Sequence, residues 1–392
     1  MPAVGSMMKE LMMRSRCLAI MFVVLAPAVG LGQTPSAAER RIAAAERRIA
    51  ARPQSHDGYN ELALGLTQRA RDTADPAFYE RAEEAVRRSL TLDPGNLEGK
   101  KMRVWVLLGK HQFAAALELA RALNKQIPDD VQVYGFLTDA HVELGNYKEA
   151  EEACQWMLDL RPGNVPALTR AAYLRELFGD VEGSIELMSA AYQRTPPNER
   201  EDRVWLLTQL GHLEVTAGRF ENAERLLHEA LEAIPDYHYA LGNLAKLRSA
   251  QNRHEEAAGL LKRRYENAPH PENLYDLAEA LERAGRPAEA QTAYAEFEKL
   301  AMKEAENWDN ANRELIFYYA KHASKPEEAL RIARMEFARR QDVYTLDAYA
   351  WALHANSEHR QARDQIGRVL AVGTKDPAVV ARAKIISAQS RD

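Results

Sequence analysis

A recurring spacing of glycine, aromatic, alanine and proline positions constrains this chain more than any other feature. Residues 131–164 read VQVYGFLTDAHVELGNYKEAEEACQWMLDLRPGN, with Gly145, Tyr147, Ala150 and Pro162 at fixed offsets. The same offsets, each shifted by 34 positions, hold Gly179, Val181, Ser184 and Pro196. A period of this length indicates a row of stacked supersecondary units, each burying itself against its neighbours, instead of one closed core.

Each recurring residue type predicts a local structure. A glycine accepts the left-handed conformation that closes a helix, so Gly145, Gly179, Gly218 and Gly285 are expected to end the first helix of each unit. Prolines such as Pro162 and Pro235 are expected to end the second helix, because proline cannot donate to the preceding turn. Small residues let two antiparallel helices approach closely. On the first helix they are Gly211, Ala245, Ala278 and Ala350, and on the second Ala150, Ala223, Ala257, Ala290, Ala329 and Ala362.

This pattern resembles the tetratricopeptide repeat family, here in an exported bacterial form. The resemblance implies an all-α fold, a right-handed α-solenoid superhelix of tetratricopeptide-type helix-turn-helix repeats. About nine repeats fit residues 55–375, and the last three drift from the template because their closing prolines are missing. A capping helix is expected over 376–392, since a terminal repeat has one uncovered face. The resemblance also implies a long curved trough lined by the first helices, not a closed pocket.

Residues 1–32 differ from the rest of the chain. The basic residues Lys9, Arg14 and Arg16 precede an apolar run, 17–31, and small residues follow. This order is typical of a secretory signal peptide, and predicts cleavage near Gly32 and a periplasmic or secreted protein. The alternative is an uncleaved inner-membrane anchor, although a run of 15 residues is shorter than the ~20 that a spanning helix needs.

Residues 33–54 form a separate N-terminal segment that contains the duplication AAERRIA-AAERRIA. Ile42 and Ile49 lie one heptad apart, and Pro53 is expected to end this helix. It is interpreted as an N-terminal capping helix or a partly frayed leader, with a dimerisation helix as the alternative. Cys154 would be the one cysteine left after cleavage, so no intramolecular disulfide is expected and its surroundings favour a core position.

Charge and motifs argue against nucleic-acid binding and catalysis. The formal net charge is −5, with both signs interspersed and no concentrated basic stretch. The sequence contains no GxxxxGK[ST] loop, HExxH, GxSxG or CxxC motif. His228 and His254 each precede a glutamate without a second histidine at metal-binding spacing, and His354 and His359 are not on one helical face. The protein is therefore predicted to have no enzyme activity, cofactor or metal.

The predicted function is a protein-protein interaction scaffold that binds a peptide or protein partner. In the family, positions two, five, nine and twelve of each repeat face the concave groove, and aromatic side chains there supply contact area at low entropic cost. Some relatives use a Lys at position five and an Asn at position nine to hold a C-terminal carboxylate, but no repeat here has that pair. The candidate partner-binding residues are Tyr173, Trp205, His212, Tyr239, Lys246, Tyr275, Glu279, Tyr318, Lys321, Tyr344 and Trp351.

Three alternatives remain open on the sequence. Any of the candidate aromatics can pack against the adjacent helix instead of facing a partner. The chain can be a membrane-anchored envelope assembly factor, if residues 17–31 are retained. It can also be the substrate-recognition subunit of an enzyme complex. The expected state is a monomer that contacts the membrane only through an uncleaved N-terminal segment.

Overall fold

The computed structural model describes residues 35–307 and 310–388, and regular structure within them is helical throughout. The predicted signal segment 1–32 lies outside the described residues, as does the end of the chain from 389. No helix within the described ranges is both long and apolar enough to cross a membrane. The helices are α1 (Ala37–Ala51), α2 (His56–Thr73), α3 (Ala77–Leu92), α4 (Leu97–Gly109), α5 (Phe113–Gln126), α6 (Val131–Glu143), α7 (Tyr147–Leu160), α8 (Val165–Leu177), α9 (Val181–Arg194), α10 (Arg200–Thr216), α11 (Phe220–Ala233), α12 (His238–Ala250), α13 (His254–Asn267), α14 (Pro271–Arg283), α15 (Pro287–Glu304), α16 (Asn312–Lys321), α17 (Pro326–Arg339), α18 (Val343–Ala355), α19 (His359–Val372) and α20 (Pro377–Ala388).

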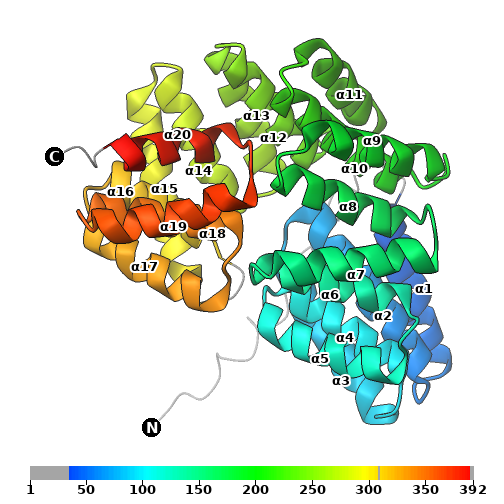
Figure 1. Cartoon of the computed structure of the whole chain (residues 1–392). Coiled ribbons are helices and arrows are strands. Elements are labelled where there is room, and N and C mark those ends of the chain that lie inside the picture. Colours follow the sequence, from blue (N-terminus) through cyan, green and yellow to red (C-terminus); the bar gives the residue numbers. More distant parts are fainter. Residues whose placement is uncertain (1–34, 308–309, 389–392) are drawn as a thin grey trace, which may run out of the picture. The chain divides into compact units, whose positions relative to one another are not determined.

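The helices α2 to α19 form nine consecutive hairpins in the described part of the chain, each packed on the next (Figure 1). The first hairpin is α2–α3 and the ninth is α18–α19, while α1 and α20 lie against the two ends of the row. The predicted fold class, an all-α solenoid superhelix of tetratricopeptide-type hairpins, is confirmed.

The recurring small residues lie where the two helices of a hairpin touch. All ten are buried, and Ala150, Ala223 and Ala257 have no exposed surface at all. At Gly211 a Cβ would lie 2.6 Å from Leu227 Cγ, so the approach of α10 to α11 is set by the missing side chain. The burial of these positions agrees with the role predicted for them, and Gly211 shows the close helix approach directly.

The turn inside each hairpin depends on one residue with positive φ. Gly145, Gly179, Gly218 and Gly285 have φ between 73° and 79°, as expected from the sequence. The other five hairpins place a non-glycine residue in the same left-handed region, at Ala74, His111, Asn252, Ser324 and Ser357. The backbone conformation therefore recurs more faithfully than the residue type.

The linkers between hairpins are also encoded locally. Pro162 lies two residues after the end of α7, and the side chain of Asn164 accepts a hydrogen bond from the Ala167 amide to cap α8. Asn96, Asp130 and Asp342 cap α4, α6 and α18 in the same way. The spacing of proline and Asn or Asp thus marks where one hairpin ends and the next begins.

The N-terminal helix α1 packs along α2 with its two isoleucines. A Cβ on Gly65 would lie 2.9 Å from Ile42 Cγ1, and one on Gly58 would lie 2.8 Å from Ile49 Cγ1. Both isoleucines are partly buried against α2, so α1 packs along the first hairpin as a capping helix does. Cys154 is buried, as predicted, and burial raises the pKa of its thiol to about 11.

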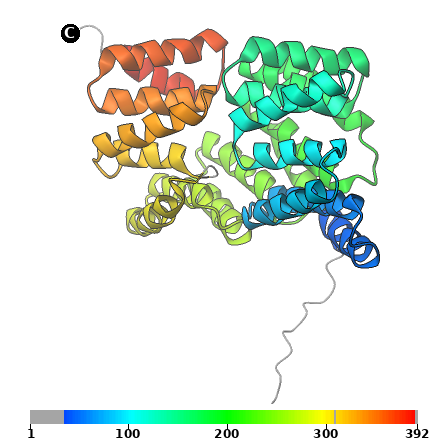
Figure 2. The same ribbon diagram turned by 90° about the horizontal axis from the view of Figure 1, so that it is seen from below.

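Turns in the first half of the solenoid touch linkers in the second half (Figures 1 and 2). The carbonyl of Glu143 accepts a hydrogen bond from the Gln341 amide at 3.0 Å, and the Tyr147 hydroxyl accepts one from Val343 at 2.8 Å. Nearer the N-terminus, the Arg71 carbonyl lies 3.2 Å from His238 Nε2. Hairpins five or six units apart are therefore in direct contact.

The interior is consequently not the long open trough that the sequence predicted, and that expectation is wrong. Glycine explains how the two halves come so close: a Cβ on Gly145 would lie 2.6 Å from the Gln341 carbonyl oxygen, and one on Gly179 would collide with the carbonyl oxygen of Gly373. These two glycines both permit the positive φ and allow the backbone contact.

Replacing Gly145 and Gly218 by alanine separates these two roles. Both residues have a φ near 74°, so each change is expected to cost about 1 to 2 kcal/mol of stability. A Cβ on Gly218 would meet no other part of the fold within 4 Å, whereas Gly145 faces the Gln341 carbonyl, so Gly145→Ala should cost about 1 kcal/mol more. Denaturant unfolding measures the difference. Equal losses in the two variants would contradict the contact between the halves.

Candidate functional site

A polar cavity of about 430 Å³ lies inside the solenoid, where the two halves face each other. Its walls come from the α4–α5 turn, α6 and α8 on one side, and from α14, α16 and the α17–α18 linker on the other. A volume of this size falls in the range of small-ligand sites. The lining includes four carboxylates, Asp139, Glu143, Glu272 and Glu314, and three guanidinium groups, Arg170, Arg313 and Arg340.

The wall from the first half is held by an ion pair between neighbouring hairpins. Arg170 on α8 donates from Nε and Nη2 to the two carboxylate oxygens of Asp139 on α6, at 2.7 and 2.6 Å. This two-point contact fixes both side chains, so neither is available as a free charge. Tyr173, one turn further along α8, keeps 37% of its surface exposed while lining the cavity.

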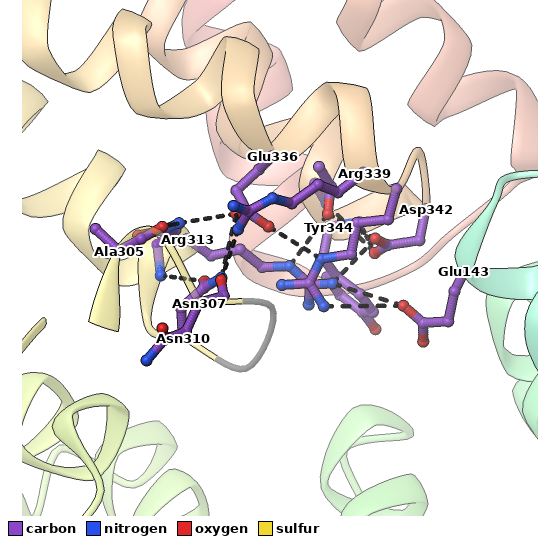
Figure 3. Close-up of polar contacts among 12 residues, drawn as sticks. Glu143, Ala305, Asn307, Asn310, Arg313, Glu336, Arg339, Asp342 and Tyr344 are labelled. Atoms are coloured by element: carbon purple, nitrogen blue, oxygen red, sulfur yellow. Dashed lines mark hydrogen bonds and ion pairs between the residues drawn. The ribbon is translucent and has the colours of Figure 1, made fainter. Parts of the chain in front are cut away.

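The opposite wall is built around Arg313 (Figure 3) and Arg340. Arg313 donates to Asp342 Oδ2 at 2.9 Å and to Thr345 Oγ1 at 3.2 Å. Asp342 also caps α18, and although burial opposes ionisation, Arg313, Arg340 and its hydrogen bonds keep the pKa of Asp342 below its usual value. Burial and the neighbouring Arg313 instead lower the pKa of Arg340.

Glu336 stabilises this wall through hydrogen bonds to neighbouring side chains. Its carboxylate is buried, and it accepts hydrogen bonds from the side-chain amides of Asn310 and Asn312 and from Arg339. These contacts join α16 to the end of α17 (Figure 3), so the linker that contains Arg340 is held in a defined position.

Glu143, at the end of α6, extends from the first half toward the two arginines. Its Oε2 lies 3.9 Å from Arg313 Nη2 and 3.9 Å from Arg340 Nη1. Burial, with a contribution from Asp342, raises the pKa of Glu143 to about 7 in spite of both guanidinium groups. The carboxyl is therefore partly protonated near neutral pH.

A second group of carboxylates lies at the α14 and α16 side of the cavity. Arg264 pairs with Asp276 at 2.6 Å and with Glu272 at 3.2 Å. Burial and the charge of Glu272 raise the pKa of Glu314 to about 7. The cavity thus holds two carboxyl groups, on opposite walls, that titrate near neutrality.

The structure separates the predicted partner-binding residues by exposure. Tyr275 and Tyr318 are buried in an aromatic cluster with Phe297, so they pack against neighbouring helices and offer little surface to a partner. Lys246 and Lys321 are exposed, and Lys321 pairs with Glu279 at 3.2 Å. The remaining six are Tyr173 in the cavity wall, His212 bonded to Glu176 at 2.7 Å, and the partly exposed Trp205, Tyr239, Tyr344 and Trp351. Whether any of them binds a partner stays a prediction.

A smaller cavity of about 200 Å³ adjoins the first. Tyr239, His238 and Arg264 line it together with the end of α2 at Arg71. Burial lowers the pKa of His238 to about 4, although the contact with the Arg71 carbonyl favours the charged form. This histidine is therefore neutral at physiological pH and contributes no charge to the cavity.

Four residues that shape the main cavity were missed by the repeat register. Glu143 follows position twelve of its repeat by one residue, Arg313 precedes position five of its own by one, and Arg340 and Asp342 lie in a linker. Glu272, at position two of the seventh repeat, could have been found from the register. The linker residues enter the interior only because the superhelix brings distant hairpins together.

Two family models, both described as Tetratricopeptide repeat, match the chain. One matches residues 107–156 and 214–272, and the other matches 137–199. The first hairpin and nearly all of the last three lie outside these matches. Together with the fold, the matches define the chain as a solenoid of tetratricopeptide-type hairpins. No curated protein shows a significant sequence match to it.

Solved structures of similar fold are distant in sequence. The human IFIT1 dimer with m7Gppp-AAAA has a TM-score of 0.51 and 12% identity, over 86% of this chain and 96% of that one. The IFIT1 dimer with PPP-AAAA has a TM-score of 0.50 and 13% identity, over 86% and 95%. The APC/C Cut9–Hcn1 hetero-tetramer has a TM-score of 0.48 and 11% identity over 83% of this chain, which spans 55% of the matched chain. These likenesses concern the fold alone.

In residues 35–307 and 310–388, no three His, Cys, Asp or Glu side chains are grouped closely enough to hold a metal ion. His354 and His359 do come together across the α18–α19 turn, with ring centroids 5.5 Å apart. They remain two residues, whereas structural metal sites in proteins use four ligands and catalytic zinc sites three.

Glu314→Gln should change how stability depends on pH. The pKa of Glu314 is about 7 in the fold and 4.5 in the reference state, so the folded protein binds the extra proton between these values and loses stability as pH rises through them. Glutamine removes this loss, and the variant should gain on the order of 2 kcal/mol relative to wild type from about pH 4.5 to about pH 7.

Denaturant unfolding across this pH range measures the effect, with Glu221→Gln on the exposed surface of α11 as the control. The control should follow the wild-type profile. A constant difference between Glu314→Gln and wild type at every pH would contradict the raised pKa.

Proposed function

We propose that the protein is a scaffold of the cell envelope that binds a peptide or protein partner at its inner face. The observation that supports this most is the cavity between the two halves of the solenoid, because it combines an exposed aromatic, Tyr173, with fixed charges of both signs. Ligand sites in proteins are concave and hold a few placed polar groups. Tetratricopeptide-type solenoids are interaction folds, and they present their inner helices to partners.

The charge of the cavity favours a peptide over a nucleic acid. Four carboxyl groups and three arginines line it, and two of the carboxyl groups, Glu143 and Glu314, are partly protonated near neutral pH. Arg170 is already engaged by Asp139, so the lining has no net surplus of cations. A phosphate backbone needs a surplus of available cations. The IFIT1 structures that resemble this fold were solved with PPP-AAAA and m7Gppp-AAAA, but at 12 to 13% identity those ligands do not carry over to this chain.

A set of exposed inner-face side chains provides the test. Tyr173→Ala, Lys246→Ala and Lys321→Ala, combined in one variant, should reduce capture of a crosslinked partner from the envelope fraction by about tenfold, a loss of about 1.4 kcal/mol. The matched control is Trp156→Ala on the second helix of its hairpin, where the indole is 53% exposed. Undiminished capture by the triple variant, or equal loss in the control, would move the binding surface elsewhere.

The envelope location rests on the basic, apolar and small-residue order of residues 1–32. N-terminal sequencing of the protein purified from its native source measures the outcome. A mature chain that begins near Gln33 is expected. A chain that retains residues 17–31 and fractionates with the inner membrane would support the anchored assembly factor instead.

A further inference from the structure

Arg340 is a buried cation whose charge is incompletely matched. The residue is 8% exposed, it lines the main cavity, and its Nε is a buried donor without a hydrogen-bond partner in the described residues. Its nearest carboxylate oxygens are Glu336 Oε2, 3.5 Å from Nε, and Glu143 Oε2, 3.9 Å from Nη1. Both distances exceed those of charge-assisted hydrogen bonds. A buried guanidinium in this state is costly unless an acceptor reaches it.

Two other polar groups at the same place can each form a further hydrogen bond. Arg313 uses Nε and Nη2 for Thr345 and Asp342, while its Nη1 makes no hydrogen bond in the described part of the chain. Glu143 Oε2 is buried and lacks a hydrogen-bond partner there. Donors from α16 and from the α17–α18 linker therefore converge with a carboxyl group from α6, on the wall of a cavity large enough for a side chain.

The chemistry of this convergence fits a carboxylate. Two guanidinium groups supply planar donors that match carboxylate geometry. A protonated Glu143 adds an O–H donor, as in a pair of carboxyl groups that share one proton. A phosphate carries more negative charge, and Asp139, Glu272 and Glu314 also line the cavity, so a singly charged anion is favoured.

We propose that the cavity binds a carboxylate of a peptide partner between Arg313 and Arg340, with Glu143 protonated and donating a hydrogen bond to it. This inference rests on the proposed function, since it specifies what the scaffold recognises. It differs from a carboxylate clamp at groove positions five and nine, because Arg340 comes from a linker and Glu143 from the opposite half of the solenoid.

Binding should weaken as pH rises above about 7. Burial sets the pKa of Glu143 near 7, so above that pH its carboxyl loses the donated proton and repels the ligand anion. The charged and titratable groups that face Glu143 from the elements packed around it are Asp139, Tyr147, Arg170, Tyr173, Arg313, Arg340 and Asp342.

Short capped peptides test the proposal on the full chain. Acetyl-Gly-Asp-Gly-amide presents a side-chain carboxylate, acetyl-Gly-Gly-Gly presents a terminal carboxylate, and acetyl-Gly-Asn-Gly-amide is the neutral control. At least one acidic peptide is expected to bind at about pH 6, at least about tenfold more tightly than the control by calorimetry or NMR titration. The peptide that binds identifies the source of the carboxylate.

Three variants locate the site. Arg340→Gln should weaken binding of the acidic peptide by about tenfold or more. Arg340→Lys should restore part of this affinity. Glu143→Gln keeps a donor but cannot ionise, so its affinity should fall clearly less than that of wild type between about pH 6 and about pH 8, and the remaining fall is assigned to Glu314. Arg248→Gln is the matched control, because Arg248 is 5% exposed and pairs with Glu224 and Gln251 away from the cavity.

The outcomes distinguish this inference from the proposed function. If neither acidic peptide binds, or if Arg340→Gln binds as wild type does, the carboxylate site is refuted, and envelope capture that depends on Tyr173, Lys246 and Lys321 would still support the scaffold. If Arg340→Gln unfolds by circular dichroism, the pH profile of Glu143→Gln still decides. An unchanged pH dependence in that variant would also refute the proposal.

Discussion

The close backbone contact between turns of the first half and linkers of the second half determines the character of this solenoid. Gly145 and Gly179 make it possible, since a side chain at either position would collide with the backbone near Gln341 or Gly373. The contact brings hairpins that are distant in sequence into one compact unit. It also converts a surface that would otherwise face open solvent into the wall of a cavity. Without it, Glu143 would end a solvated helix and would have no reason to titrate abnormally.

The charges inside that cavity are arranged in pairs that differ in how completely they are satisfied. Asp139 and Arg170 satisfy each other between adjacent hairpins, and such local pairs form as soon as two neighbours stack. Glu143 and Arg340 come from opposite halves and remain at 3.9 Å. Buried charges of this second kind contribute little to stability and are better understood as groups held ready for a ligand. The two kinds of pair differ because adjacent hairpins form the first by themselves, whereas the second forms only when the whole superhelix brings distant hairpins together.

The distant solved relatives place this chain among solenoid proteins without assigning it a partner. At 12 to 13% identity the IFIT1 structures share how hairpins stack, which depends on small residues and turn conformations. Recognition depends on the side chains that face inward, and these vary independently of the stacking. Here the inner face is mixed in charge, with Tyr173 as its exposed aromatic in the cavity wall.

The sequence by itself determined the hairpins, because glycine at a positive φ, small residues at helix contacts and proline in linkers act within a few residues of each other. It also indicated Tyr173 as an inner-face residue. It did not show that Tyr275 and Tyr318 are buried, since an apolar ring at a groove position can equally fill the core of a tight superhelix. The partnership of Glu143 with Arg340 was decided by the tertiary structure alone. The curvature that joins them is the sum of small rotations over many hairpins, and no local pattern encodes that sum.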